Sequence, residues 1–290
     1  MEGPGRPNCV HGARRLARLT LPLLAAALGA YCGSHGGNPA APSSSSTSGP
    51  REVVFRSGGL DLHGYLWEPA GRGPFRTVLY NHGSEKEPGS KPVLGAFFVA
   101  QGYAFFVPHR RGQGLSPGPY ISDLVAQASP SQQNQVVVNE LVSQADDVSS
   151  ALEYLLQLPE IDHERVAVAG CSYGGIETLL AAERPQPLRT AVDFAGAAES
   201  WKGNPLLQSR LIVAADAAHI PVFFIQAVND YDTTPSLVLS AEMAKVGKNN
   251  QIKIYPAYGL TAQDGHGGFC TNATDVWGQD VLAFLRMWMP

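Results

Sequence analysis

From residue 51 onward, short apolar runs alternate with stretches of helical periodicity. Four of the runs, VLY, AFFV, VAVA and VFFI, contain no charged residue, which is typical of strands that helices cover on both faces. The stretches between them place apolar residues at helical spacing. A repeated strand–helix order predicts a mostly parallel sheet with right-handed crossovers, so the fold class is α/β with helices on both faces.

The expected elements can be placed along the chain. The strands are expected at 51–56, 60–68, 76–80, 104–108, 165–169, 190–194, 221–227 and 251–255, and the helices at 92–101, 136–157, 174–184, 236–246 and 275–288. Ser57-Gly58-Gly59 separates the first two strands, which predicts an antiparallel hairpin ahead of the parallel strands. We therefore expect residues 51–290 to form one domain.

The first 50 residues have a different composition. Three arginines, at 14, 15 and 18, precede an uncharged and mostly apolar stretch that runs to residue 32. This pattern is typical of an export signal, because the apolar stretch is too short to span a bilayer comfortably. Residues 33–50 are almost all Gly, Ser, Pro, Ala, Asn and Thr, as in a flexible tether. We expect an exported protein, either periplasmic or extracellular.

Cys32 leaves two fates open for the exported chain. It lies between the apolar stretch and the tether, where a lipid-modified cysteine of a bacterial lipoprotein would lie. Tyr31, however, is bulky at a position where a small residue is expected. The alternatives are a lipid anchor to the membrane through Cys32 and simple cleavage with secretion.

Charge and cysteine content exclude several classes of protein. The net charge is −4, which favours neither nucleic acid nor an anionic membrane surface as a partner. The sequence has no zinc-type spacing of Cys and His and no phosphate-binding loop, so we expect no metal and no organic cofactor. Cys171 and Cys270 fall in the expected domain. We expect two buried free thiols, although an exported compartment would permit a disulfide.

The pattern Gly-x-Ser-x-Gly occurs twice. The copy at 114–118 lies in a Gly/Pro-rich loop and has Pro117 after the serine. Proline has no N–H to donate to an oxyanion, so we interpret this copy as a turn. The copy at 170–174 directly follows the strand RVAVA and precedes a helix, which is the context of a nucleophile elbow. Ser172 is therefore the candidate nucleophile, and the N–H of Tyr173 is a candidate oxyanion donor. Cys171 is a poorer nucleophile candidate because Tyr173 would crowd its elbow.

A serine nucleophile of this type needs a base and an acid that follow it in the order Ser, acid, His. His266 lies between the last strand and the last helix, flanked by glycines, which we interpret as a mobile, exposed loop. Asp230 and Asp232 both follow the strand PVFFIQ. We favour Asp230 because it is nearer the strand end. Either aspartate could instead cap the following helix.

Two further segments are expected to complete the site. The loop after the strand RTVLY contains His82, Gly83 and Ser84, and we assign the second oxyanion donor to the N–H of Ser84. His82 is interpreted as a structural hydrogen-bonding residue. Residues 113–140 are expected to overhang the site as a partial lid.

These motifs together resemble a known family. HGS at 82–84, PHRRGQGLSPGPY at 108–120, GCSYGG at 170–175, QAVNDYDTTPS at 226–236 and GHGGF at 265–269 resemble the dienelactone-hydrolase-like and prolyl-oligopeptidase-like branch of the α/β hydrolases. The resemblance spans nearly all of residues 51–290, and it implies an α/β-hydrolase fold with Ser172, Asp230 and His266 as a triad. The chain differs from true dienelactone hydrolases in its serine nucleophile and from the oligopeptidases in lacking a propeller domain.

The expected function is therefore hydrolysis of a small-molecule carboxylic ester or related acyl compound through an acyl-enzyme. A small exported serine peptidase is an alternative, because the same groups can cleave amides. A non-catalytic binding module on a hydrolase scaffold is disfavoured, because serine, acid and histidine are all present in order.

Overall fold

The computed structural model describes residues 49–290, which fall within one compact unit. The predicted export signal, Cys32 and most of the predicted tether lie outside the described residues. Within residues 49–290, no helix is long and apolar enough to cross a membrane.

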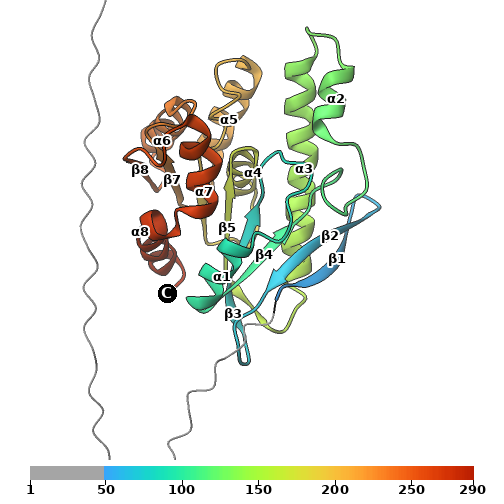
Figure 1. Ribbon diagram of the computed structural model, residues 1–290, viewed down its shortest axis with the longest axis vertical. Helices are drawn as coiled ribbons and strands as arrows, with labels where there is room; N and C mark the ends of the chain where they lie inside the picture. The colour runs from blue at the N-terminus through green and yellow to red at the C-terminus, as the bar shows by residue number, and fades with distance from the viewer. Residues whose placement is uncertain (1–48) are drawn as a thin grey trace, which may run out of the picture. The chain divides into compact units, whose positions relative to one another are not determined.

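An eight-stranded sheet runs through the described chain in the order β1-β2-β4-β3-β5-β6-β7-β8 (Figure 1). Its strands are β1 (Arg51–Ser57), β2 (Leu60–Trp67), β3 (Phe75–Asn81), β4 (Tyr103–Pro108), β5 (Ile161–Cys171), β6 (Thr190–Phe194), β7 (Val222–Ala227) and β8 (Asn250–Tyr255). β2 pairs antiparallel with both β1 and β4, and the remaining neighbours are parallel. The mostly parallel sheet with an N-terminal antiparallel hairpin is confirmed.

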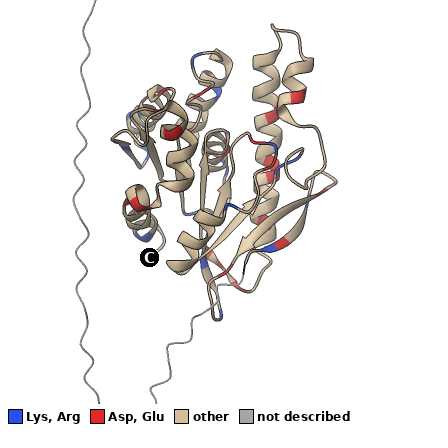
Figure 2. Cartoon of the chain, viewed as in Figure 1, with Lys and Arg blue, Asp and Glu red and all other residues tan. Residues whose placement is uncertain are grey.

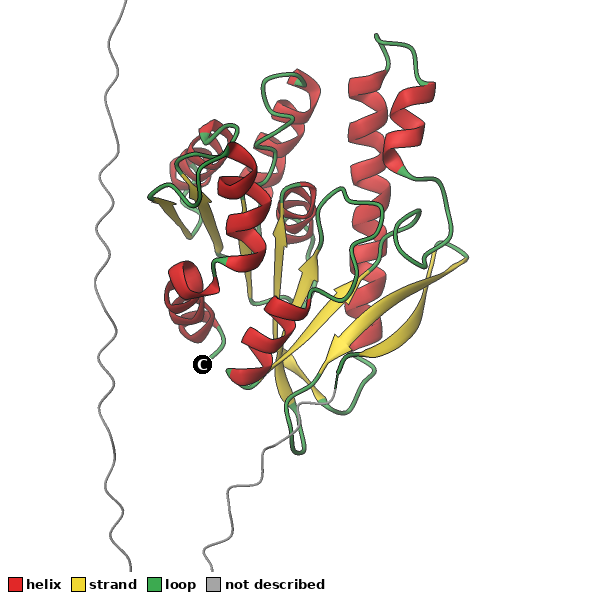
Figure 3. Cartoon of the chain, viewed as in Figure 1, coloured by secondary structure: helices red, strands yellow, loops and turns green. Residues whose placement is uncertain are grey.

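Helices cover both faces of the sheet (Figure 3). They are α1 (Pro92–Ala100), α2 (Ile121–Gln127), α3 (Gln133–Leu155), α4 (Tyr173–Ala182), α5 (Pro205–Ala217), α6 (Thr234–Lys245), the π-helical turn η1 (Asp264–Gly268), α7 (Phe269–Asn272) and α8 (Thr274–Trp288). α2 and the beginning of α3 form a helical hairpin that stands above the strands.

Consecutive buried residues in β4 and β7 explain why the apolar runs AFFV and VFFI contain no charged residue. Phe105 and Phe106 are both fully buried, and so are Phe223 and Phe224. Phe106 and Phe224 belong to one apolar cluster, whereas Phe105 and Phe223 belong to another. Because side chains alternate between the two faces of a strand, this division places one core on each side of the sheet.

Four helical segments, α2, α5, η1 and α7, were not predicted from the sequence. α2 has seven residues, which is too short for a clear periodic signal. α5 did have a recognisable start, because the side chain of Asn204 accepts a hydrogen bond from the Leu207 N–H at 3.0 Å and Pro205 occupies the first turn. An Asn cap followed by Pro is a known start signal.

Candidate active site

Ser172 lies in a strained turn between β5 and α4. Its φ of 58° and ψ of −119° fall outside the regions that a non-glycine residue ordinarily adopts. A Cβ at Gly170 would lie 2.2 Å from the carbonyl oxygen of Gly174, and one at Gly174 would lie 2.0 Å from that of Asn81. Only glycine therefore permits the close crossing that presents Ser172 at the end of the sheet, as a nucleophile elbow requires.

His266 and Asp230 are in direct contact. Nδ1 of His266 lies 2.9 Å from Oδ1 and 3.0 Å from Oδ2 of Asp230. The carboxylate of Asp230 also accepts a hydrogen bond from the backbone N–H of Tyr231 at 2.6 Å. The Asp230 side chain is fully buried, so its interaction with the imidazole is little screened by solvent.

The prediction of a mobile, exposed loop around His266 was wrong. His266 is 3% exposed and lies in η1, a π-helical turn that leads directly into α7. A Cβ at Gly265 would lie 2.6 Å from Oδ1 of Asn229. The Asn229 amide in turn donates to the carbonyl oxygens of Tyr258 and Thr261. The glycines thus serve close packing against the loop after β7 rather than mobility.

Asp232 has a different environment from Asp230. Its Oδ1 accepts a hydrogen bond from the Thr234 N–H at 3.0 Å, at the start of α6. Its Oδ2 lies 3.6 Å from Nζ of Lys202. The structure therefore places Asp230 against the histidine and gives Asp232 a helix-capping contact.

A second carboxylate near His266 was not anticipated from the sequence. Glu199 follows β6, and its Oε2 lies 3.5 Å from Nε2 of His266. Burial lowers the pKa of His266, but the neighbouring carboxylates of Asp230 and Glu199 outweigh it and raise this pKa to about 9. Among the described residues, neither Ser172 nor any other residue forms a hydrogen bond with Nε2. Catalytic hydrogen bonds are often long without substrate.

Ser84 lies in the loop after β3, beside Ser172. Both serines line the same two cavities, and the hydroxyl of Tyr120 donates to the carbonyl oxygen of Ser84 at 2.7 Å. In the same loop His82 is fully buried, and burial together with the charge of Arg110 holds its pKa well below the ordinary value. Its neutral ring fits the structural role predicted for it.

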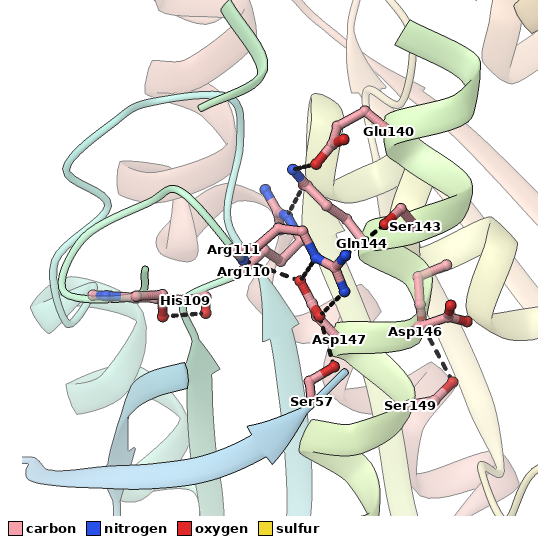
Figure 4. Close-up of polar contacts among 12 residues, drawn as sticks. Ser57, His109, Arg110, Arg111, Glu140, Ser143, Gln144, Asp146, Asp147 and Ser149 are labelled. Atoms are coloured by element: carbon pink, nitrogen blue, oxygen red, sulfur yellow. Dashed lines mark hydrogen bonds and ion pairs between the residues drawn. The ribbon is translucent and has the colours of Figure 1, made fainter. Parts of the chain in front are cut away.

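Arg110 is fully buried behind this loop. Its Nη2 donates to the carbonyl oxygens of His82 and Gly83, each at 2.8 Å. Its Nε donates to Oε1 of Gln144 on α3 at 2.9 Å (Figure 4), and its guanidinium carbon lies 5.2 Å from the centre of the Tyr173 ring. One guanidinium group thus contacts both segments that carry the predicted oxyanion donors.

The neighbouring Arg111 joins the loop after β4 to α3. Asp147 is 1% exposed and accepts hydrogen bonds from the Arg111 backbone N–H at 3.0 Å and from its Nε at 2.9 Å. Asp147 also accepts from the hydroxyl of Ser57 at 2.7 Å (Figure 4). A buried carboxylate with this many donors is well compensated for its lost hydration.

The first Gly-x-Ser-x-Gly copy forms a turn. The hydroxyl of Ser116 donates to the carbonyl oxygen of His109 at 2.7 Å and accepts from the His63 N–H at 2.9 Å. Both contacts are structural, because the first lies within the loop after β4 and the second joins this loop to β2.

The expectation of two free thiols was wrong. Cys171 and Cys270 form a disulfide with their Cα atoms 5.9 Å apart. Cys171 directly precedes Ser172, and Cys270 follows His266 by one helical turn in α7. The two cysteines are 99 residues apart in sequence, so their approach depends on the packing of α7 against the end of β5.

Two cavities meet at Ser172. A polar one of about 600 Å³ is lined by His266 and the segment around it, together with Glu85 and Lys91, which form an ion pair. A more apolar one of about 380 Å³ extends beneath α2 and the beginning of α3. Ser84, Ser172 and Glu199 line both cavities. In the part of the chain that the structure describes, no group of three or more His, Cys, Asp or Glu residues could hold a metal ion.

Two curated proteins are similar in sequence to this chain. An uncharacterised peptidase of Bacillus subtilis, YtmA, is 29% identical over 150 residues, which are 51% of this chain and 48% of that protein. The quorum-quenching protein AidA of Acinetobacter baumannii is 28% identical over 171 residues, 56% of this chain and 50% of that protein. The chain thus spans about half the length of these relatives.

Solved structures share the fold. An acylaminoacyl peptidase of Pyrococcus horikoshii superposes with a TM-score of 0.61 at 18% identity, over 83% of this chain and 41% of that one. An esterase of Pyrococcus furiosus superposes with a TM-score of 0.60 at 16% identity, over 83% of this chain and 91% of that one. These similarities show the α/β-hydrolase fold.

A family model covers more than half of the chain. The model described as X-Pro dipeptidyl-peptidase (S15 family) matches residues 58–220, a range that includes the loop after β3 and the turn at Ser172 but ends before Asp230. The chain therefore belongs to the X-Pro dipeptidyl-peptidase (S15) family and has the α/β-hydrolase fold.

Proposed function

We propose that the protein is a serine hydrolase that cleaves carboxylic esters or related acyl compounds through an acyl-enzyme. The observation that carries this proposal is the arrangement of Ser172 and His266. Ser172 occupies a strained elbow, and both residues line one cavity, where the imidazole is held by a buried aspartate.

In this mechanism Ser172 attacks the substrate carbonyl carbon while Nε2 of His266 takes the hydroxyl proton. The imidazolium then gives that proton to the leaving group, and a water molecule repeats the sequence to release the acid. Asp230 orients the ring and stabilises the imidazolium. The N–H groups of Tyr173 and Ser84 stabilise the oxyanion, and the N-terminus of α4 favours its negative charge.

Peptide substrates are the second candidate. The family to which the chain belongs and the name of its Bacillus relative both favour a peptidase. A panel of p-nitrophenyl esters measured beside Gly-Pro p-nitroanilide separates the two, because the latter carries the dipeptide acyl group that the family name describes.

The test of the hydrolase proposal is covalent labelling with a fluorophosphonate probe. Ser172→Ala should abolish labelling and lower ester hydrolysis by about 10³-fold or more. Ser116→Ala removes the serine of the other Gly-x-Ser-x-Gly copy and should retain labelling. Labelling that persists in Ser172→Ala would contradict the proposal, and a wild-type protein that neither labels nor hydrolyses any ester or amide would favour a binding module.

We also propose export of the mature protein, on the basis of the arginine-flanked apolar stretch and the tether. Sequencing of the mature N-terminus from the native host would test it, and Cys32→Ser would separate lipid anchoring from secretion. An uncleaved cytoplasmic chain would contradict it.

A further inference from the structure

The two cavities at Ser172 differ in chemistry and in their relation to His266. His266 lines the polar cavity together with Gly267 and Gly268. It does not line the apolar cavity, whose walls include Val125 of α2, Val137 of α3 and Ile176 of α4. Ser172 therefore lies between a polar cavity that His266 lines and an apolar cavity that His266 does not line.

The position of the histidine determines which part of a substrate occupies each cavity. The imidazole that receives the Ser172 proton must return it to the leaving group, so the leaving-group atom has to lie within hydrogen-bond reach of Nε2. The acyl substituent, on the other side of the carbonyl carbon, must extend away from the histidine. In this structure that direction is the cavity beneath α2 and α3.

From this geometry, which rests on the hydrolase function proposed above, we infer that the substrates are esters of an apolar acyl group with a polar alcohol that carries no negative charge. The acyl group occupies the cavity beneath the α2–α3 hairpin, and the alcohol occupies the cavity around His266.

The apolar cavity suits an acyl chain of moderate length. Its volume of about 380 Å³ lies near the lower end of the range for small-molecule sites. Ile121 and Ile176 are buried in its wall. The hairpin that closes it has no Lys or Arg from Ile121 to Leu155, and Figure 2 shows only acidic charges on it. A chain placed there gains about fourfold in binding per buried methylene until the cavity is full.

The charge of the other cavity selects the alcohol. Lys91 is paired with Glu85, and the carboxylate of Asp264 accepts from the backbone N–H groups of Leu260 and Thr261. Glu199 is half exposed, and its one ion-pair contact among the described residues is with Nε2 of His266, where the leaving group must lie. A carboxylate at that point repels an anionic alcohol and attracts a cationic one.

The first experiment varies the acyl chain at a constant alcohol. Wild-type kcat/KM for p-nitrophenyl esters should rise from acetyl to a medium-length chain and then fall. Val125→Trp, which fills the cavity, should lower kcat/KM for octanoate by about tenfold or more relative to acetate. Leu124→Trp, on the same helix but outside the cavity wall, should keep the wild-type profile.

The second experiment varies the alcohol at a constant acyl chain. Butyryl esters of choline, glycerol and glycolate provide a cationic, a neutral and an anionic alcohol. We expect kcat/KM to fall in that order, with the choline and glycolate esters differing by roughly tenfold, and Glu199→Gln to remove most of this difference.

The outcomes separate this inference from the proposed function. A Val125→Trp variant that alters alcohol preference and leaves the acyl profile unchanged would reverse the assignment of the two cavities. Faster cleavage of Gly-Pro p-nitroanilide than of every ester would overturn the apolar acyl class while leaving Ser172 as the nucleophile. A wild-type protein that neither reacts with the fluorophosphonate probe nor hydrolyses any substrate would instead refute the hydrolase function itself.

Discussion

Two carboxylates contact the imidazole of His266 through its two ring nitrogens, Asp230 at Nδ1 and Glu199 at Nε2. Asp230 is buried and holds the ring, whereas Glu199 is half exposed and faces the position of the reacting groups. The two should therefore have different effects when they are replaced.

Replacement of the buried aspartate should affect the rate of catalysis strongly. Asp230→Asn should lower kcat by about 10²- to 10⁴-fold, because an amide favours the wrong tautomer of His266. Asp232→Asn is the matched control and should cost roughly tenfold or less, since Asp232 contacts the N–H of Thr234 instead. Kinetics on variants of equal thermal stability would check this, and the reverse order would move the acid to Asp232.

Replacement of Glu199 should change the pH dependence of kcat/KM. In the proposed mechanism His266 acts as a base only when unprotonated. Its pKa is raised to about 9, so wild-type kcat/KM should increase as pH rises through about 9. Glu199→Gln removes one of the contacts that raise this pKa, so the ascending limb should move to lower pH. Activity toward a neutral ester at pH 7 should then rise several-fold. An unchanged pH–rate profile would show that Glu199 does not influence the ionisation of His266.

At the scale of elements, the disulfide joins the end of β5 to α7. It fastens the turn that carries Ser172 to the helix that follows His266, and it closes a loop of about a hundred residues. Cross-links of long loops restrict the unfolded chain more than those of short loops.

Loss of this cross-link should lower stability. We expect the double variant Cys171→Ala/Cys270→Ala to unfold with a free energy about 3 kcal/mol below that of the wild type. Urea denaturation of both proteins would measure the difference. Addition of a reductant that reaches the disulfide should destabilise the wild type and have no effect on the double variant. Equal stability of the wild type and the double variant in the absence of reductant would contradict a stabilising role of the disulfide.

At the scale of the whole molecule, one buried acid should set part of the pH dependence of stability. Glu177 on α4 is fully buried, and neither of its carboxyl oxygens has a hydrogen-bond partner among the described residues. Burial raises the pKa of Glu177 to about 8, from an ordinary value of 4.5. The folded chain thus binds this proton more tightly than the unfolded chain does, so the free energy of unfolding falls as pH rises from about 4.5 to 8.

The Glu177→Gln variant has no ionisable group at this position. Its free energy of unfolding should therefore lack this fall between about pH 4.5 and 8. The free energy of unfolding of the variant, minus that of the wild type, should therefore be larger at pH 8 than at pH 4 by on the order of 3 kcal/mol. Urea denaturation at the two pH values would measure it. Glu153→Gln, at an exposed position of α3, is the control and should show little pH-dependent difference. An equally small difference for Glu177→Gln would indicate that the acid is solvated in the folded protein.

The order of the strands, the fold class and the turn at Ser172 could all be predicted from the sequence. These features depend on local patterns. Charge-free strands require cover on both faces, and glycines at 170 and 174 permit a crossing whose close contacts lie near in sequence or on the adjoining strand. The contact of Asp230 with His266 agrees with the preference for the aspartate nearer the strand end, and that preference was also a local argument.

Only the tertiary structure decided the features that join distant segments. The disulfide and the approach of Glu199 to His266 depend on how the loops after β6 and β8 pack at the end of β5, and no local pattern encodes that packing. The glycines around His266 were misread for the same reason. A glycine permits both mobility and close approach. At Gly265 the reason is close approach, because a Cβ there would lie 2.6 Å from the side chain of Asn229. These two residues belong to segments that are far apart in the sequence.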